Sequence, residues 1–180
     1  MNELNQKFTP SLEKMEKVEP QIETATTKNI KDIQNLNRLL FEEEFVKYDK
    51  TINCDWPLSQ DGEDFYKERV ESKKGCAFVL KINEKIVGYL AGSLSENEFY
   101  RNVDSFAELD DMYIIEEHRR AGHGKKLYDA FIGWCKENAV KRIKVLVTAR
   151  NTQAIKFYKT QGFNDYNVTL ESDIDQLNKL

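Results

Sequence analysis

The spacing of hydrophobic residues near the start of the chain predicts one strand followed by one helix. Residues 21–26 alternate weakly between polar and apolar side chains, which is typical of a strand. Thr27 is expected to cap a helix that runs to about Tyr48. The apolar positions of that helix recur at helical spacing: Ile30, Ile33, Leu36 and Leu40.

The next part of the chain is expected to be a loop and a second helix. Residues 50–61 contain the run Asp-Trp-Pro and are interpreted as the loop. A helix is predicted over residues 62–73, with Phe65 and Val70 facing inward. Residues 1–20 are polar and mixed in charge, so we expect an N-terminal extension outside the core.

Three β-rich runs follow. Residues 76–82 and 85–93 are separated only by Asn83 and Glu84, which predicts a hairpin. Residues 106–115 are expected to form a further strand.

The last third of the chain alternates helix and strand. Residues 124–138 place one side of a helix inward, through Leu127, Phe131, Trp134 and Cys135. Residues 143–149 are rich in β-branched side chains and are expected to form a strand covered on both faces. A short helix is predicted over residues 152–161 and a last strand over residues 164–170.

The predicted order is β-α-α-β-β-β-α-β-α-β, which indicates a mixed sheet with helices on its faces. The fold class is therefore α/β (or α+β), in a single domain over residues 21–172 with a C-terminal tail at 173–180. A chain of 180 residues is long enough to bury a core in one domain.

Composition narrows the class of protein. With 40% hydrophobic and 11% aromatic residues the chain is expected to fold, and a net charge of −4 gives no reason to expect a nucleic-acid partner. No apolar run approaches the roughly 20 residues of a membrane span, and the first residues do not resemble a secretory signal. The three cysteines have no metal-ligand spacing, which favours a reducing cytoplasm: Cys54, Cys76 and Cys135.

Two glycines stand in a basic loop between a predicted strand and a predicted helix. The loop reads Arg-Arg-Ala-Gly-His-Gly-Lys-Lys over residues 119–126. Gly122 and Gly124 let the backbone turn tightly and approach a ligand, and the helix that follows offers unpaired N–H groups and its positive dipole end. Such a loop suits a pyrophosphate, and its basic side chains attract phosphates. The alternative is a simple turn with solvated charges, in which His123 is an exposed loop residue.

Two other phosphate-binding loops are excluded by the residues at fixed offsets. A P-loop requires Ser or Thr after Gly-Lys, where Lys126 stands, and a further glycine upstream, where Arg119 stands. A dinucleotide-binding loop requires a third glycine at the position of Leu127.

Two motifs at their observed spacing resemble those of the GNAT superfamily of N-acetyltransferases. The strand Glu-Leu-Asp-Asp-Met-Tyr-Ile at residues 108–114 precedes a loop that matches Arg-x-x-Gly-x-Gly. About 30 residues later, residues 151–163 read Asn-x-x-Ala-x-x-Phe-Tyr-x-x-x-Gly-Phe. The resemblance covers roughly residues 21–170, and its specificity lies between residues 106 and 163. It implies a mostly antiparallel sheet whose strands splay at the acetyl-CoA site.

The resemblance implies the following roles. The loop holds the CoA pyrophosphate, strand residues 112–114 pair with the pantetheine arm, and the strand at 143–149 splays away, often with a bulge. Asn151 makes a polar contact to the cofactor, Ala154 and Phe157 face its arm, and no metal is needed. The residues expected to bind acetyl-CoA are Met112, Tyr113, Ile114, Arg119, Arg120, Ala121, Gly122, His123, Gly124, Lys125, Asn151, Ala154, Phe157 and Tyr158.

Two residues are candidates for catalysis. Glu108 lies eleven residues before Arg119, as does the base in the histone-acetylating branch of the family, and is the expected base for the amine. Asp110 is expected on the same face of the strand and Asp111 on the other. Tyr158 is the expected acid for the thiolate. The alternatives are solvated strand-end carboxylates and a core aromatic. A covalent acyl-cysteine route is poorly supported, so direct attack in a ternary complex is expected.

The amine acceptor is not readable from sequence. Acidic residues of the first two helices and their loop favour a small cationic amine, and Asp110, Asp111 and Trp56 are the candidate substrate-binding residues. Trp56 and Tyr48 either line the acceptor pocket or close the core. The alternatives are acetylation of a protein N-terminus or lysine, and a CoA-binding module without catalysis. Relatives are often dimers, so a homodimer is also an expectation.

Overall fold

A computed structural model describes residues 19–95 and 100–174 of the chain. The chain divides into two compact units, one up to Val145 and one from Leu146 onward. The expected N-terminal extension, residues 1–20, lies almost wholly outside the described residues, as does most of the expected C-terminal tail. Among the helices of the described residues, none is long and apolar enough to cross a membrane.

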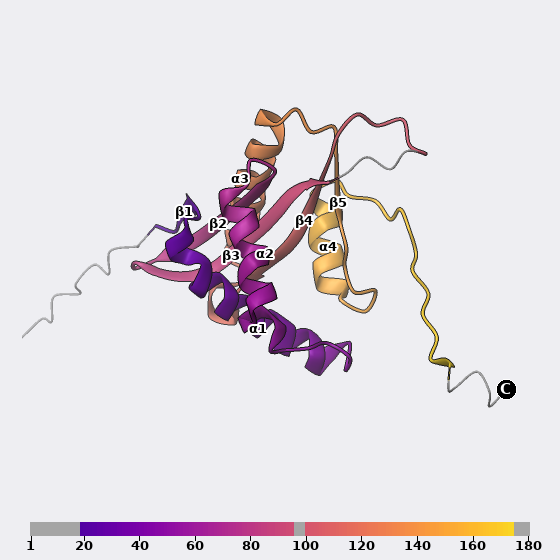
Figure 1. Ribbon diagram of the computed structural model, residues 1–180, viewed down its shortest axis with the longest axis horizontal. Helices are drawn as coiled ribbons and strands as arrows, with labels where there is room; N and C mark the ends of the chain where they lie inside the picture. Colours follow the sequence, from indigo (N-terminus) through magenta and orange to yellow (C-terminus); the bar gives the residue numbers. More distant parts are fainter. Residues whose placement is uncertain (1–18, 96–99, 175–180) are drawn as a thin grey trace, which may run out of the picture. The chain divides into compact units, whose positions relative to one another are not determined.

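The first unit is built on a five-stranded sheet in the order β1-β2-β3-β4-β5 (Figure 1). All neighbouring strands run antiparallel except β4 and β5, which are parallel. The mixed, mostly antiparallel α/β architecture expected from the sequence is thus confirmed. The strands are β1 (Gln21–Thr24), β2 (Gly75–Ile82), β3 (Lys85–Ser95), β4 (Phe106–Ile114) and β5 (Arg142–Val145).

Helices cover both faces of the sheet. On one face lie α1 (Ile30–Lys47) and α2 (Gln60–Glu71), in front of the strands in Figure 1. On the other lies α3 (His123–Glu137), whose Phe131 ring would be only 2.6 Å from a Cβ placed on Gly92 of β3. Gly92 is therefore the residue that lets α3 approach the sheet.

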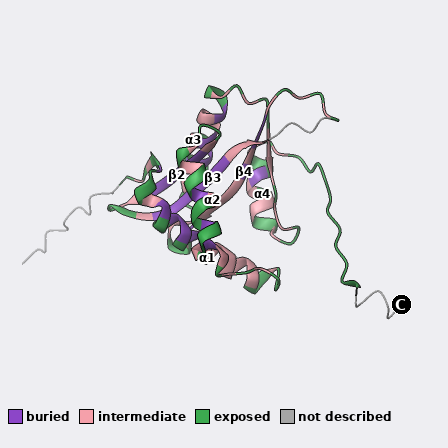
Figure 2. Cartoon of the chain, viewed as in Figure 1, coloured by how far each residue is buried: buried purple, intermediate pink, exposed green. Residues whose placement is uncertain are grey.

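The core between the sheet and the first two helices is formed by alternate strand residues and the apolar stripes of the helices (Figure 2). Burying these side chains is the main stabilising contribution to the fold. The most buried members are Ile33, Tyr66, Val79, Tyr89 and Ala91.

The hairpin between β2 and β3 is confirmed. Asn83 and Glu84 both have positive φ, 50° and 61°, the conformation that a two-residue hairpin turn with matching twist requires.

Several element boundaries differ from the sequence prediction for local reasons. Thr27 does not cap α1, because Thr27–Asn29 form a short 3-10 helix, η1, that Thr26 precedes; the Thr26 N–H donates to the Asn29 side chain at 2.9 Å. The predicted loop over residues 50–61 contains a second 3-10 helix, η2 (Trp56–Leu58), and the start of α2. Ser59 caps α2 by accepting from the Gly62 N–H, so the helix begins earlier than predicted.

The prediction of a long buried strand over residues 143–149 is wrong. β5 ends at Val145, and its residues are exposed or half-buried. β5 pairs only with β4, so it is an edge strand of the described sheet and not a strand covered on both sides. A β-branched run signals a strand but does not show whether the strand is central.

The second unit contains the helix α4 (Thr152–Thr160), whose bounds are close to the prediction. The predicted strand over residues 164–170 is wrong: the segment forms no strand in the described chain, and Val168 and Leu170 are 84% and 90% exposed. Alternating apolar residues are necessary for a half-buried strand, but they do not supply the neighbouring strand that completes its hydrogen bonds.

Candidate acetyl-CoA site

The glycine loop joins the end of β4 to the start of α3, as predicted. After Ile114 a 3-10 helix, η3 (Glu116–His118), leads into the loop. Arg120 and Gly122 have positive φ, 62° and 81°, and Gly122 is the residue before the first turn of α3. No side chain caps this helix, so its first N–H groups are directed at the loop without a side-chain acceptor. An anion fits such a helix start.

Arg119 does not present its guanidinium to the loop. Its Nη1 and Nη2 donate to the two carboxylate oxygens of Glu43 on α1, at 3.2 and 2.6 Å, and its Nε donates to the Ile114 carbonyl at 2.6 Å. The guanidinium also lies 4.9 Å from the ring centre of Tyr113. Hydrogen bonds from Arg119 lower the pKa of the Glu43 carboxyl and raise the pKa of Arg119 itself. The Arg119 side chain therefore connects the loop to α1. The predicted electrostatic attraction for phosphates would have to come from the other basic residues of the loop.

Other charged groups of the loop have simpler surroundings. Lys125 pairs with Asp129 one turn along α3, where both side chains are about half exposed. Burial, followed by the charge of Lys126, lowers the pKa of His123, so its imidazole is largely neutral at pH 7. Its Nδ1 is buried without a hydrogen-bond partner among the described residues.

The strand that leads into the loop is paired on both sides only over its first half. β5 is in register with β4 over Phe106–Leu109 and no further. β3 continues to pair with β4 as far as Ile114. The segment Met112–Ile114 therefore keeps one edge that β5 does not cover, as expected for strands that splay.

Glu108 lies in this first half of β4. It is opposite Lys144 of β5, whose Nζ is 3.1 Å from its Oε2, and the Glu108 side chain is 33% exposed. On its other side Glu108 is in register with Ser93 of β3. The carboxylate is thus accessible to solvent and already faces one cation.

A bulge in β4 follows directly. Asp111 is opposite Ala91 of β3 and Leu109 is opposite Gly92, so Asp110 is an extra residue without a partner position. The bulge lies in β4 and not in the strand at 143–149, where the resemblance placed it. It also changes where the two aspartates point, because an extra residue interrupts the alternation of side chains.

Both aspartates point toward α2. Asp110 accepts from the Nε of Arg69 at 2.6 Å, in a pair whose side chains are each 13% exposed. Asp111 accepts from the Tyr66 hydroxyl at 2.9 Å. The expectation that Asp111 would face the opposite side of the strand is therefore wrong. Burial raises the pKa of Asp110, and it raises that of Asp111 to about 6.

The partners of Asp111 belong to a buried polar chain that sequence reasoning missed. The Tyr66 hydroxyl is 3.4 Å from that of Tyr89 on β3, which accepts from Nδ2 of Asn37 on α1 at 2.8 Å. Burial raises the pKa of both tyrosines far above the usual value, so both hydroxyls keep their protons. Asn37 interrupts the apolar stripe of α1, four residues after Ile33, and that interruption was the available signal.

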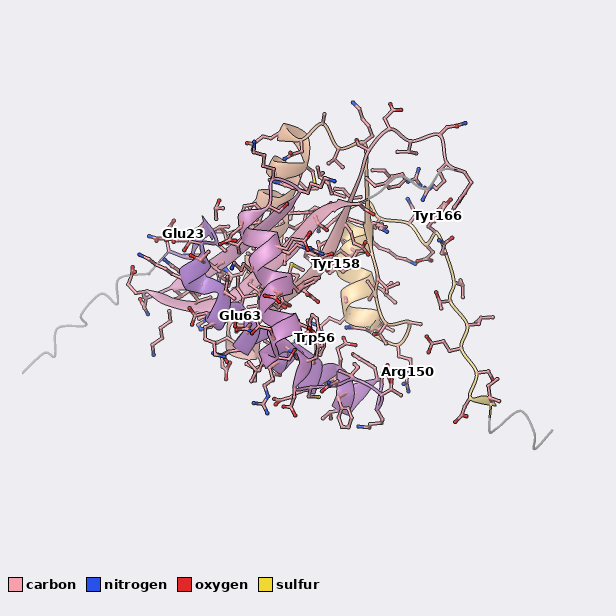
Figure 3. The ribbon with its side chains drawn as sticks, viewed as in Figure 1. Glu23, Trp56, Glu63, Arg150, Tyr158 and Tyr166 are labelled. Atoms are coloured by element: carbon pink, nitrogen blue, oxygen red, sulfur yellow. The ribbon has the colours of Figure 1, made fainter. Side chains whose placement is uncertain are left out.

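Trp56 lies at the connection between α1 and α2 (Figure 3). Its ring stacks on Phe41 with ring centres 5.9 Å apart, and it packs edge-to-face with Phe65, with ring centres 5.7 Å apart. Phe65 in turn lies under the guanidinium of Arg69, 4.2 Å from its ring centre. A row of contacts thus connects Trp56 with the Asp110 end of the bulge.

In the second unit the motif residues stabilise α4 itself. The Asn151 side chain accepts from the Ala154 N–H at 3.0 Å and caps the helix. Tyr158 is buried, and its ring packs edge-on against Phe157 and Phe163, with centres 5.2 and 5.5 Å away.

The buried cysteines are poor nucleophiles. Burial raises the pKa of Cys76 and raises that of Cys135 to about 12, so both thiols stay protonated at neutral pH. A covalent route through either of them would need the thiolate.

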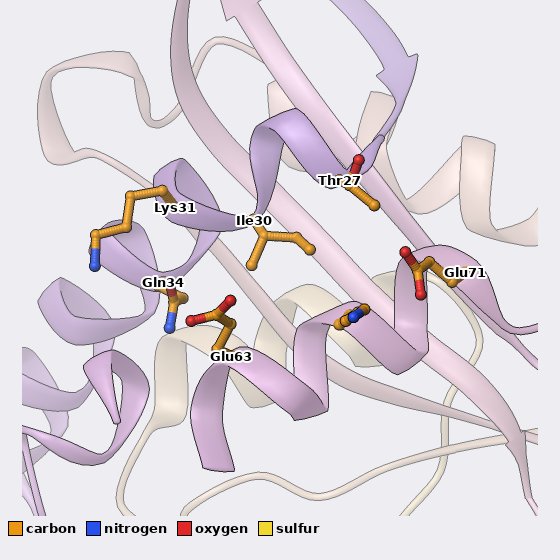
Figure 4. Close-up of a pocket in the computed structure, with 7 residues that line it drawn as sticks. Thr27, Ile30, Lys31, Gln34, Glu63 and Glu71 are labelled. Atoms are coloured by element: carbon orange, nitrogen blue, oxygen red, sulfur yellow. The ribbon is translucent and has the colours of Figure 1, made fainter. Parts of the chain in front are cut away.

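A groove lies between α1 and α2 (Figure 4). None of the candidate residues lines it. Its walls are mixed in charge: Thr27, Ile30, Lys31, Gln34, Glu63, Lys67 and Glu71.

Known structures share this fold. The BH1408 protein from Bacillus halodurans has a TM-score of 0.75 at 20% identity, over 86% of this chain and 99% of that one. The aminoglycoside N-acetyltransferase AAC(6')-Iy, solved in complex with CoA, has a TM-score of 0.69 at 13% identity, over 87% of this chain and 95% of that one. At these identities the likeness establishes the fold.

The family follows from the sequence itself. The profile of the acetyltransferase (GNAT) family matches residues 30–163, most of the chain. An uncharacterized N-acetyltransferase of Methanocaldococcus jannaschii is 26% identical over 106 residues, which is 58% of this chain and 46% of that protein. The chain thus spans about half the length of this curated relative. The chain belongs to the GNAT acetyltransferase family.

Proposed function

We propose that the chain transfers the acetyl group of acetyl-CoA to a primary amine by direct attack, with a small cationic amine as acceptor. The observation that carries the proposal is the start of α3, where Gly122 has φ of 81° and no side chain caps the helix. Backbone N–H groups between Arg120 and Lys125 would hold the pyrophosphate there. The edge of β4 at Met112–Ile114 would pair with the pantetheine arm.

Glu108 is the proposed base. An amine with a pKa near 10.4 is protonated at neutral pH and must lose a proton before it can attack. Glu108 is partly exposed and lies in the half of β4 just before the uncovered edge, so an acceptor can reach it. Lys144 neutralises the carboxylate before the amine arrives and stabilises it as the acceptor approaches.

Tyr158 is the proposed acid. As the amine nitrogen forms its bond to the acetyl carbon, the carbon–sulfur bond breaks and the thiolate takes a proton from the Tyr158 hydroxyl. The proton that the nitrogen loses on becoming an amide then restores that hydroxyl, through solvent. Such proton transfer is worth about 10²- to 10⁴-fold in rate. A backbone N–H of the strand at Met112 would meet the charge that develops on the carbonyl oxygen. The protonated cysteines give no support to an acyl-enzyme alternative.

The choice of a small cationic amine rests on two observations. Acidic side chains gather along α1 and the connection to α2, although Arg38 pairs with both Glu42 and Asp55. Trp56 lies beside them, is only half-buried although it stacks on Phe41, and an indole ring is the side chain best suited to contact an organic cation. The similar fold of an aminoglycoside N-acetyltransferase agrees with this choice.

The test measures release of free CoA thiol from acetyl-CoA against polyamines, aminoglycosides, amino acids and short peptides. We expect release with polyamines or aminoglycosides. Release only with peptides would replace the small amine by a protein substrate. Acetyl-CoA that raises the melting temperature without turnover on any amine would leave a CoA-binding module and overturn the transferase.

Two variants test the assigned residues in the same assay. Tyr158→Phe should lower turnover at least tenfold while acetyl-CoA affinity stays within about twofold, because only the proton donor is lost. Gly124→Val should abolish acetyl-CoA binding in a folded protein. Unchanged turnover in the first, or retained affinity in the second, would remove that residue from the site.

A further inference from the structure

The two carboxylates of the β4 bulge have little room for a substrate. Asp110 is held by Arg69 and Asp111 by Tyr66, at 2.6 and 2.9 Å. Both partners come from α2, three residues apart, and thus from neighbouring turns on one side of the helix. The bulge is therefore attached to α2 at two points.

The second of these attachments has a fixed direction. The Asn37 amide nitrogen donates to the Tyr89 hydroxyl, and Tyr66 has a single hydroxyl proton, so when that proton is donated to Asp111 the Tyr89 hydroxyl is the donor to Tyr66. Tyr66 in turn donates to Asp111. The chain of donors ends on a carboxylate, and that hydrogen bond is strongest when Asp111 is ionised.

The helix attached in this way is α2, and it carries Phe65, which packs against Trp56 on the side where the amine acceptor is proposed to bind. Phe65 lies between Trp56, at 5.7 Å, and the guanidinium of Arg69, at 4.2 Å. A change in how α2 sits on the bulge must move Phe65 and alter its contact with Trp56, because packed side chains transmit displacement.

We propose that Asp110 and Asp111 are positioning residues that fix α2, and the Phe65–Trp56 wall it carries, against the β4 bulge, and that neither binds the amine. Their part in acetyl transfer rests on the proposed function, whereas the attachment itself does not. The bulge thus fixes the position of the Phe65–Trp56 wall, next to the point where β4 stops pairing with β5.

The protonation of Asp111 supports this arrangement. Burial raises its pKa to about 6, against the hydrogen bond from Tyr66, which lowers it; Asp110 raises it and Arg69 lowers it. Tyr89 is the remaining titratable group in this series of hydrogen bonds, and its hydroxyl stays protonated. Protonation of Asp111 below about pH 6 weakens the hold on Tyr66.

The test follows the fluorescence of Trp56 against pH without any substrate. The chain has two tryptophans, so Trp134→Phe leaves Trp56 as the reporter, and the replacement ring can keep the stacking contact with Phe131 in α3. We expect a transition with a midpoint near pH 6. In that background Asp111→Asn should remove the transition and give the low-pH signal at every pH.

Tyr66→Phe is the matched variant, because it keeps the ring and the carboxylate and removes one hydroxyl. The midpoint should rise, since the lost hydrogen bond had favoured the ionised form. A transition that persists in Asp111→Asn, or a midpoint that Tyr66→Phe leaves in place, would overturn the attachment.

A kinetic measurement then tests the role in acetyl transfer, with the amine that the thiol-release panel identifies. Asp111→Asn should raise KM for the amine about tenfold and leave KM for acetyl-CoA within about twofold. A changed KM for acetyl-CoA with an unchanged KM for the amine would overturn the role. The fluorescence titration needs neither acetyl-CoA nor an amine. Failure of the transferase assignment and failure of the attachment of α2 to the bulge are therefore distinguishable.

Discussion

Asp111 is a residue whose charge is costly to the folded state. Its pKa of about 6 lies above the ordinary value of 3.8, so the folded chain binds the proton more tightly than the unfolded chain between these values. The contribution of Asp111 to stability is therefore fully present below about pH 4 and is lost as the pH rises through about 6. A shift of about two units corresponds to roughly 3 kcal/mol.

Replacing Asp111 should flatten the pH dependence of folding. We expect the free energy of unfolding of Asp111→Asn, relative to the unmodified chain, to rise by roughly 2–3 kcal/mol between pH 4 and pH 7.5. Urea unfolding at both pH values measures this. Asp129→Asn, on the exposed side of α3, serves as the control and should leave the dependence within about 0.5 kcal/mol. A pH dependence identical in Asp111→Asn and the unmodified chain would contradict the raised pKa.

At the scale of the element, one glycine just before α3 and one within it should have opposite effects when replaced. A Cβ at Gly122 or at Gly133 would meet no heavy atom within 4 Å, so neither substitution creates a clash. Gly122 has φ of 81°, which costs alanine about 1–2 kcal/mol, whereas Gly133 lies within the helix, where alanine is favoured by about 1 kcal/mol.

Gly122→Ala should therefore lower the free energy of unfolding by about 1 kcal/mol and Gly133→Ala should raise it by about as much. Chemical denaturation of the two variants side by side measures the difference. Gly122→Asn should lie between Gly122→Ala and the unmodified chain, because asparagine tolerates the left-handed region. Equal effects at the two positions would mean that the loop relaxes to an ordinary φ.

The elements show which structural information the sequence carried. The hairpin at Asn83 and Glu84 and the helices α1 to α4 were predictable, because turn length and apolar spacing are local signals. The prediction of a strand at residues 164–170 was wrong because strand formation depends on a neighbouring strand from elsewhere in the sequence. The bulge left one trace: two consecutive aspartates, where strict alternation would place an apolar residue. The partners of those aspartates were not readable, because contacts across more than 40 residues have no local pattern.

On the scale of the whole molecule, the pair Arg119–Glu43 joins residues 76 positions apart, the glycine loop and α1. Both side chains are about three-quarters buried, so the loss of one partner leaves a poorly solvated charge. The loop that is proposed to hold the pyrophosphate is thereby connected to α1, the helix proposed to border the amine acceptor.

Breaking this pair should weaken both folding and acetyl-CoA binding. Arg119→Met should lower the free energy of unfolding by about 1–3 kcal/mol, or roughly 2–8 °C in melting temperature, and reduce acetyl-CoA affinity. Glu43→Gln should act similarly, and the double variant should cost less than the sum of both. Lys125→Met breaks an exposed pair and should change stability by no more than about 0.5 kcal/mol. Additive losses in the double variant would show that the two side chains act separately.

The β4 bulge makes a one-residue deletion possible in the middle of a strand. Leu109 and Asp111 already stand opposite adjacent residues of β3, so removing Asp110 would leave an unbroken ladder with every other side chain on its present face. Asp110 is thus a residue that the sheet can lose without any change of register. A chain lacking it should fold with its hairpins intact and lose the hydrogen bonds of Asp110 with Arg69 and Ser93. This deletion therefore separates the residues that the strand needs from the residue that attaches the strand to α2.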